Sequence, residues 1–410
     1  MSYPFLKDVS IIESSAFVPA PLAGMALAQF GADIIRVDAI GGGIDYRRAP
    51  LAKEHGRSLF WTSLNAGKRS LALDFRKPEA RELLQQLVIC TGNLLTNRSS
   101  SWLSHDSLVG RRKDLISCTI EGNPDGSSAM ECTIQSATGL PMLARKSLDD
   151  RPTNTPFPAW DVITAYQAAF SFVGAINRRL VTGEGSWIKI AMSDVAFSTM
   201  SHLGLLTEAQ VCGTDRGPIG NDVYGAFGRD FSTADGSYVM VVAITQPQWN
   251  ALVSCCQAQD NIAIAEKSSG LDFQDELQRY EGRELIAMIL APWFAARKFT
   301  EVERALNEFQ VSWGRYSSIK QLLATDCRVG AQNSVFELRA TPGVGEHFGA
   351  HLATRFEGIA RTPWSGAPLL GAHTDEVLST VLGLSGSEIA RLHDKKIVAG
   401  PDSDPTVHCD

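Results

Sequence analysis

The segment VSIIESSAFVPAPLAGMALAQFGADIIRVD, residues 9–38, determines the fold class of this chain. Residues 9–13 are rich in β-branched side chains and predict a short strand, and the apolar run 21–30 begins at a proline and predicts a helix. Gly31 ends this helix, and residues 34–37 predict a second buried strand. Two short apolar strands joined by a helix are typical of parallel pairing, so we expect an open α/β sheet.

The same alternation of strands and helices continues through the first half of the chain. The further predicted elements are strand 70–74, helix 78–88, strands 92–96 and 115–120, helix 161–180, strand 187–190 and a helix from about residue 193. The turn after the first strand reads ESSAFVPAP and lacks the GxGxxG pattern. The fold class alone therefore does not indicate a dinucleotide-binding protein.

The length of 410 residues exceeds what one ordinary hydrophobic core supports, so two domains are expected. The sequence changes character in the middle, where a clear strand at 238–244 is followed by charge-rich helical segments. We predict a Rossmann-like large α/β domain with an open parallel sheet, formed by residues 1–221 and 333–410. Residues 222–332 would form a smaller α/β domain inserted into it.

The composition excludes several classes of function. A formal net charge of −7 argues against nucleic-acid binding, and no apolar run approaches the length that spans a membrane. The start of the chain lacks the features of a secretory signal. Its eight cysteines are scattered without a CxxC pair, which predicts reduced thiols in the cytoplasm and no metal site.

Asp161 is the first candidate for chemistry. It lies in FPAWDVITAYQAAF, immediately before a long apolar helical run. An aspartate in this place is commonly only the N-cap of the helix. The positive end of the helix also favours the ionised carboxylate, which would leave Asp161 available as a nucleophile. On the residues alone, both interpretations stay open.

Three cations and two glycine-rich runs are weaker candidates. Lys68 and Arg69 lie in SLNAGKRSLALD before a predicted strand, and Arg36 lies at the end of another. They are either solvated or suited to bind the phosphates of a nucleotide-bearing ligand. The glycine-rich runs at 41–43 and 217–231 are ordinary turns, or they form a mobile cover over a ligand.

Four segments in this order resemble signatures of the family III CoA-transferases. They are residues 9–38, LNAGKRSLALDFRKPEARELL (64–84), TGEGSWIKIAMSDVAF (182–197) and APLLGAHTDEVLSTVLGLSGSEI (367–389). The resemblance covers nearly the whole chain. It implies a homodimer of interlocked chains, and a substrate that is the CoA thioester of a small dicarboxylic acid, with no cofactor beyond the coenzyme A of the substrate.

The resemblance also assigns residues. It places the catalytic aspartate of the family on Asp161. It implies CoA contacts from Ala16, Phe17, Arg36, Lys68, Arg69 and Asn97. The family commonly has an ENFxPG-like loop where this chain reads TNRSSSW (96–102), so Asn97 matches and the aromatic residue and Pro-Gly pair do not.

FPAWD and GNDVYGAFGRDF (220–231) resemble a subgroup that moves CoA within one molecule, between the C1 and C4 carboxyls of mesaconate. Three alternatives are an intermolecular CoA-transferase, an acyl-CoA racemase and a non-enzymatic CoA-binding protein. The racemase would pair its aspartate with an upstream histidine, but no histidine occurs between His105 and His202. Loss of the nucleophile would favour the non-enzymatic role, and Asp161 is present.

Overall fold

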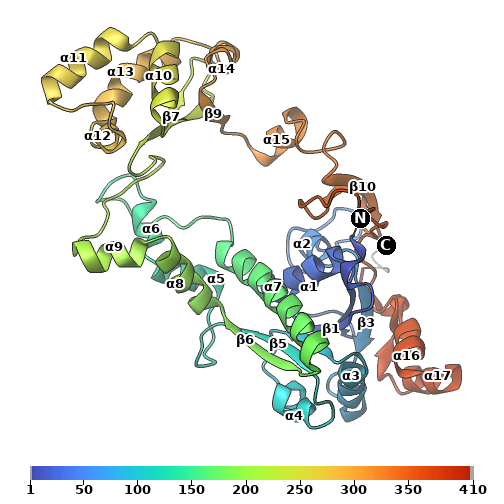
Figure 1. Cartoon of the computed structure of the whole chain (residues 1–410). Helices are drawn as coiled ribbons and strands as arrows, with labels where there is room; N and C mark the ends of the chain where they lie inside the picture. Colours follow the sequence, from blue (N-terminus) through green and yellow to red (C-terminus); the bar gives the residue numbers. More distant parts are fainter. Residues whose placement is uncertain (1, 407–410) are drawn as a thin grey trace. The chain divides into compact units, whose positions relative to one another are not determined.

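The computed structural model describes residues 2–406 (Figure 1). The chain divides into two compact units. The first comprises the described residues up to Thr138, Pro156–Leu205 and those from Cys327 onward, and the second comprises Gly139–Thr155 and Leu206–Asp326. The predicted small domain, residues 222–332, overlaps the second unit, and its exact limits stay a prediction.

The first unit contains a seven-stranded sheet. Its strands are, in spatial order, β12 (Val398–Ala399), β3 (Arg69–Leu73), β2 (Asp33–Ala39), β1 (Ser10–Ser14), β4 (Asn93–Thr96), β5 (Ile116–Glu121) and β6 (Ser186–Ala191). All neighbours pair in parallel except β12, which runs antiparallel to β3. The predicted open parallel sheet is therefore confirmed. The strand order reverses between β1 and β4, the kind of position where open α/β sheets bind ligands.

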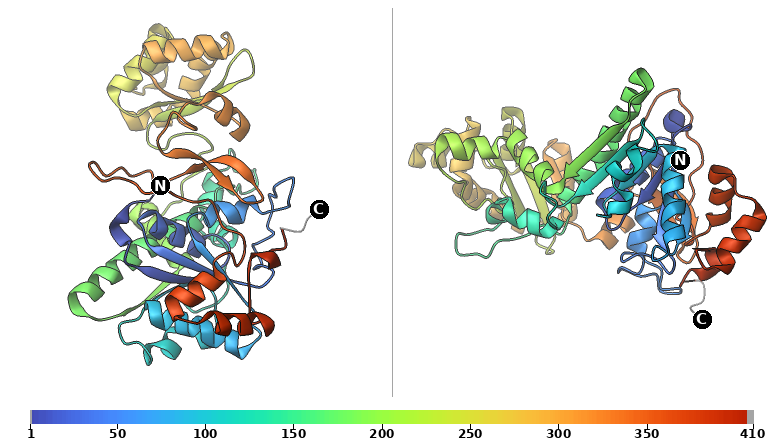
Figure 2. Two further views of the ribbon diagram at one scale, coloured as in Figure 1. Left: turned by 90° about the vertical axis from the view of Figure 1, so that its right-hand side faces the viewer. Right: turned by 90° about the horizontal axis from the view of Figure 1, so that it is seen from below.

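Helices cover both faces of this sheet (Figures 1 and 2). The helices of the first unit are α1 (Pro19–Gln29), α2 (Leu59–Leu64), α3 (Pro78–Thr91), α4 (His105–Val109), α5 (Glu131–Ala137), α7 (Ala159–Thr182), α8 (Met192–His202), α16 (Thr374–Leu382) and α17 (Gly386–Asp394). Because side chains alternate along a strand, neighbouring residues of β1 enter opposite layers: Ile11 packs with α1 and α7, and Ile12 packs with α3 and α16.

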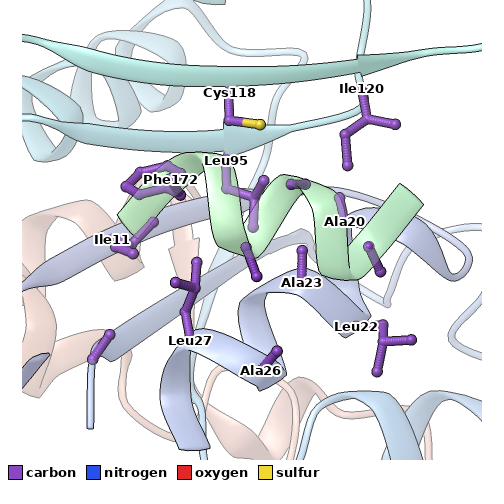
Figure 3. Packing of buried hydrophobic residues seen from close by; sticks show 14 of the residues in the cluster. Ile11, Ala20, Leu22, Ala23, Ala26, Leu27, Leu95, Cys118, Ile120 and Phe172 are labelled. Atoms are coloured by element: carbon purple, nitrogen blue, oxygen red, sulfur yellow. The ribbon is translucent and has the colours of Figure 1, made fainter. Parts of the chain in front are cut away.

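α7 is the predicted catalytic helix, and it packs with α1 on one face of the sheet. In Figure 3, Phe172 of α7 and Leu27 of α1 point toward Ile11 and Leu95 of the sheet. All four side chains are almost fully buried. Alanine at many of the buried positions of α1 and α7 lets the two helices pack closely against each other.

The second unit has its own core. A three-stranded antiparallel sheet consists of β7 (Phe227–Ser232), β8 (Tyr238–Ala243) and β9 (Ser312–Arg315). The helices are α6 (Leu140–Leu143), α9 (Leu205–Cys212, whose first residue belongs to the first unit), α10 (Gln246–Cys255), α11 (Gln259–Ser269), α12 (Glu276–Glu281), α13 (Arg283–Ala295), α14 (Phe299–Glu308) and α15 (Ile319–Thr325). Strands and helices share one buried cluster around Trp249 and Phe294.

The glycine-rich run 217–231 is an ordered turn leading into β7. The Val223 amide donates to the Gly228 carbonyl at 3.0 Å, and the Asp222 carboxylate binds Arg229 at 2.6 Å. A Cβ on Gly228 would collide with the Val223 side chain, so the close packing requires glycine there. Of the two interpretations of this run, these contacts support the turn.

A hairpin, β10 (Phe336–Thr341) and β11 (Gly345–Ala350), lies in the last part of the first unit. The buried carboxylate of Asp404 accepts hydrogen bonds from the Leu370 amide and the Tyr46 hydroxyl, which fastens the end of the described chain to the large sheet domain. None of the helices in the described part of the chain is both long enough and apolar enough to cross a membrane.

Candidate active site

Asp161 lies in the first turn of α7, as the third helical residue. The N-cap of this helix is Pro158, and the structure assigns no capping hydrogen bond to a side chain. The N-cap interpretation of Asp161 was therefore wrong. The first turn is held by packing instead, because Trp160 is buried and Val162 and Ile163 contact the apolar cluster shared with α1.

The surroundings of Asp161 are unusual for a carboxylate. Burial and, to a smaller extent, the nearby Glu131 carboxylate raise the pKa of Asp161, and the Arg48 guanidinium lowers it in part; the net result is a pKa of about 7. The helix N-terminus was expected to favour the ionised carboxylate and to leave Asp161 available as a nucleophile. Burial and the like charge of Glu131 act against ionisation, and the role of Asp161 as nucleophile stays a prediction. A carboxylate with a raised pKa is more basic and a better nucleophile once it is ionised.

Polar atoms without partners gather around this turn. In the described chain, Glu131 Oε1, Trp160 Nε1 and Thr164 Oγ1 are buried and have no hydrogen-bond partner. Burial also raises the pKa of Glu131. Buried polar groups normally have hydrogen-bond partners. Three buried atoms without partners, two in the first turns of α7 and one on α5, therefore indicate a place where a polar ligand binds.

Ala16, Phe17 and Asn97 meet at the switch point of the sheet, between the ends of β1 and β4. The Asn97 side chain accepts from the Ala16 amide at 2.9 Å and donates to the Ala16 carbonyl at 2.7 Å. The Phe17 amide donates to Asp45 at 2.9 Å, and Phe17 adopts a positive φ of 62°. These bonds hold a strained turn at the edge where α/β sheets bind ligands.

Arg36 lies beneath this turn and is completely buried. It binds Asp38 at 2.8 Å, Glu13 at 2.9 Å and Ser15 at 2.7 Å. Lys68 binds the other oxygen of the Glu13 carboxylate at 2.8 Å, and burial lowers the pKa of Lys68 to about 8. The structure thus brings Arg36 and Lys68 together as a paired network under the switch point.

Arg69 is separated from this network. It begins β3 beside Ile35 of β2, but its side chain binds Asp33 at 2.9 Å and Glu376 at 3.1 Å instead of Glu13. Lys68 and Arg69 are adjacent in sequence, but their side chains lie in different places and neither forms part of a solvated loop. Their contact with CoA stays a prediction.

The family model of CoA-transferase family III matches residues 6–374, which is most of the chain. The chain belongs to the family III CoA-transferases. It is 42% identical over 402 residues to the 2-methylfumaryl-CoA isomerase of Chloroflexus aurantiacus, an alignment that covers 97% of this chain and 98% of the relative. The resemblance inferred from the four sequence segments is confirmed.

Two further comparisons agree with this family. The succinyl-CoA–D-citramalate CoA-transferase of Chloroflexus aurantiacus is 26% identical over 407 residues, covering 96% of this chain and 98% of the relative. A crystal structure of a CaiB/BaiF family protein from Brucella suis matches the fold with a TM-score of 0.77, at 21% identity, over 93% of this chain and 100% of that chain. The chain is therefore an enzyme with the fold of the family III CoA-transferases.

The sequence interpretation missed three residues of this transferase's candidate site. Glu131 and Arg48 are the charged neighbours of Asp161, and Arg98 lies half-buried beside Asn97. Arg98 belongs to the TNRSSSW segment that departs from the family pattern, and Arg48 ends the segment GGGIDYRR. The sequence shows both arginines as charged residues next to loops that were predicted to bind the ligand. Nothing in the sequence around Glu131 indicates that it lies near Asp161.

The arrangement contains groups that suit acyl transfer. Asp161 offers a basic carboxylate, Glu131 a second carboxyl group and Arg48 a cation. In the described residues, no group of three or more histidine, cysteine, aspartate or glutamate side chains is placed to hold a metal ion.

Proposed function

We propose that this enzyme moves CoA between the C1 and C4 carboxyls of mesaconate, within one molecule, through a thioester on Asp161. The observation that carries the proposal is the partly buried carboxylate of Asp161, with its raised pKa, in a chain 42% identical to a 2-methylfumaryl-CoA isomerase. The ends of β1 and β4, with Ala16, Phe17 and Asn97, support CoA binding at the switch point beside it.

The transfer needs four steps that conserve atoms and charge. The Asp161 carboxylate attacks the thioester carbonyl, a mixed anhydride forms, and CoA leaves as the thiolate. The thiolate then attacks the aspartyl carbonyl, which gives an aspartyl-CoA thioester and releases the C1 carboxylate of mesaconate. The C4 carboxylate attacks this thioester, which expels the CoA thiolate and forms a second mixed anhydride. The thiolate then attacks the C4 carbonyl of this anhydride, which gives mesaconyl-C4-CoA and releases the Asp161 carboxylate. Covalent catalysis divides one difficult exchange into easier steps.

The surroundings of Asp161 suit this scheme. Desolvation makes the carboxylate more nucleophilic, and the apolar packing around Trp160 limits the access of water to two intermediates that water would hydrolyse. Every group that the scheme uses is a carboxylate, a thioester or a thiolate, so it requires no metal and no redox cofactor.

The sequence predicted that three cations, Arg36, Lys68 and Arg69, contact CoA directly, and the proposal gives them different roles. The ion pairs of Arg36 and Lys68 with Glu13 support their role as cations that shape the CoA-binding turn from below. The position of Arg69 at the start of β3 supports a contact with CoA least, because ligands of such sheets bind at the carboxyl ends of the strands.

We also propose that the enzyme works in the cytoplasm as a homodimer of interlocked chains. α7 is apolar on two faces: one packs on the sheet, and Tyr166, Phe170 and Val173 form an exposed stripe on another. Phe170 is 81% exposed. A stripe of this kind is typical of a protein interface. A Phe170→Glu variant that stays dimeric in light scattering would contradict this role of α7.

The function is tested by incubating the enzyme with mesaconyl-C1-CoA alone. We expect mesaconyl-C4-CoA to form, and a peptide containing Asp161 to carry CoA after rapid quenching and mass spectrometry. Asp161→Asn should abolish both while CoA binding remains. An absolute requirement for a second acid would assign the enzyme to intermolecular transfer. Mesaconyl-C1-CoA has no α-proton, so the racemase alternative is tested with a saturated 2-methylacyl-CoA, and exchange of its α-proton would assign the enzyme to the racemases.

A further inference from the structure

Arg48 presents a guanidinium group beside the reactive carboxylate. Its charge acts on Asp161, and its side chain is exposed. The guanidinium carbon lies 5.8 Å from the centre of the Phe17 ring and 5.4 Å from that of Phe60, distances at which aromatic faces attract a cation. An attraction of this kind holds the guanidinium in place without a hydrogen-bond acceptor, so its N–H groups remain available to donate.

The backbone holds Arg48 in this place. The Arg48 amide donates to the Asp45 carbonyl at 3.1 Å, and the Ser58 hydroxyl donates to the Arg48 carbonyl. Ser58 in turn caps α2, the helix that carries Phe60. The Asp45 side chain accepts from the Phe17 amide, so one residue orients both the arginine and the ring that it lies on.

Arg48 differs from the other cations around the switch point. Arg36 is bound to three carboxylates, and Arg57 donates to two carbonyl groups. In the part of the chain that the structure describes, the guanidinium of Arg48 has no hydrogen-bond or carboxylate partner. A positioned arginine with free donors near the Asp161 carboxyl group has the properties of an anion-binding residue.

We infer that Arg48 binds the free carboxylate of the substrate and thereby selects CoA thioesters of dicarboxylic acids. This inference rests on the proposed function, because it concerns the same site. A diacid thioester brings a further negative charge toward Asp161 and Glu131, and like charges repel each other more strongly at a partly buried site than in bulk water. Arg48 offsets this repulsion and offers a planar, bidentate partner for the carboxylate.

The same contact has a role after the first transfer. Once CoA is on Asp161, the released diacid carries two carboxylates and no covalent bond to the enzyme. Arg48 holds one of them while the other approaches the aspartyl thioester. Retention of the diacid is what distinguishes transfer within one molecule from exchange with free acids.

The test compares two ligands in an Asp161→Asn background, where transfer cannot proceed. The ligands are mesaconyl-C1-CoA and a thioester of the same carbon skeleton in which a methyl group replaces the free carboxylate. Affinity is measured by calorimetry for the background, Arg48→Gln, Arg48→Lys and Arg47→Gln. Arg47 is the neighbouring exposed arginine and serves as the matched control.

We expect Arg48→Gln to weaken binding of mesaconyl-CoA by about 10- to 100-fold and to leave binding of the methyl analogue unchanged. Arg48→Lys should restore part of the loss, and Arg47→Gln should have no effect. If the background does not prefer mesaconyl-CoA, or if Arg48→Gln keeps the preference, the inference is wrong. If wild-type enzyme fails to isomerise mesaconyl-CoA but the preference still depends on Arg48, the proposed function fails and the assignment of Arg48 stands.

Discussion

Replacing Asp161 by asparagine should stabilise the folded enzyme at alkaline pH. Asparagine has nearly the same shape as aspartate but carries no charge. In the folded state its pKa is about 7, whereas its ordinary value is 3.8. The folded state therefore binds the proton of Asp161 more tightly than the unfolded chain does, and ionisation of this group destabilises the fold.

The size of this penalty follows from the pKa difference. It is absent below the unfolded pKa, grows as pH rises from about 4 to about 7, and is constant above the folded pKa. About three pKa units correspond to at most about 4 kcal/mol. Asp161 is partly buried, so solvent screening reduces the expected gain of the variant to about 1–2 kcal/mol at pH 8. At pH 5 about a third of that gain should remain.

Thermal unfolding of Asp161→Asn at pH 8 and pH 5 measures this effect. We expect a Tm about 2–4 °C above that of the wild type at pH 8 and a smaller difference at pH 5. Asp194→Asn is the matched control, because Asp194 is also the third residue of its helix, α8, but is exposed. That variant should lose a little stability, since an acidic group near a helix N-terminus is favourable. A loss of stability in Asp161→Asn at pH 8 would refute the reasoning.

Two other substitutions follow from the structure. Glu131→Gln removes a negative charge that raises the pKa of Asp161, so the acid limb of the pH profile of kcat/KM, expected near pH 7, should move to lower pH. If the acid limb does not move, the two carboxyl groups do not interact. Gly24→Ala should destabilise the enzyme, because a Cβ there would overlap the Glu13 carboxylate, whereas Gly174→Ala meets open space and should raise the Tm through better helix propensity. Equal Tm changes in the two alanine variants would contradict the packing described for Glu13.

The large sheet domain could be predicted from the sequence because its signals are local. Residues 9–38 contain a strand, a helix and a strand whose apolar runs match β1, α1 and β2 within two residues at each end. β12 was missed because two residues, Val398–Ala399, carry no periodic pattern. Its antiparallel pairing with β3 is set by the return of the chain after α17, which is a tertiary event.

The candidate site could be predicted only in part. Asp161 was found from its place before an apolar helix, but the pKa of its carboxyl group depends on Glu131 and Arg48, which are distant in sequence. Arg36 and Lys68 were identified as free cations because their partner Glu13 lies on another strand. Charge is visible in a sequence, whereas burial and ion pairing are not.

An exchange experiment tests the central claim of transfer within one molecule most directly. The enzyme is incubated with unlabelled mesaconyl-C1-CoA and an excess of isotopically labelled free mesaconate, and the C4 thioester is analysed by mass spectrometry. If the diacid remains bound between the two transfers, the C4 product should carry almost no label. Labelled product in proportion to the free acid would contradict the claim and show that the enzyme exchanges CoA between separate molecules.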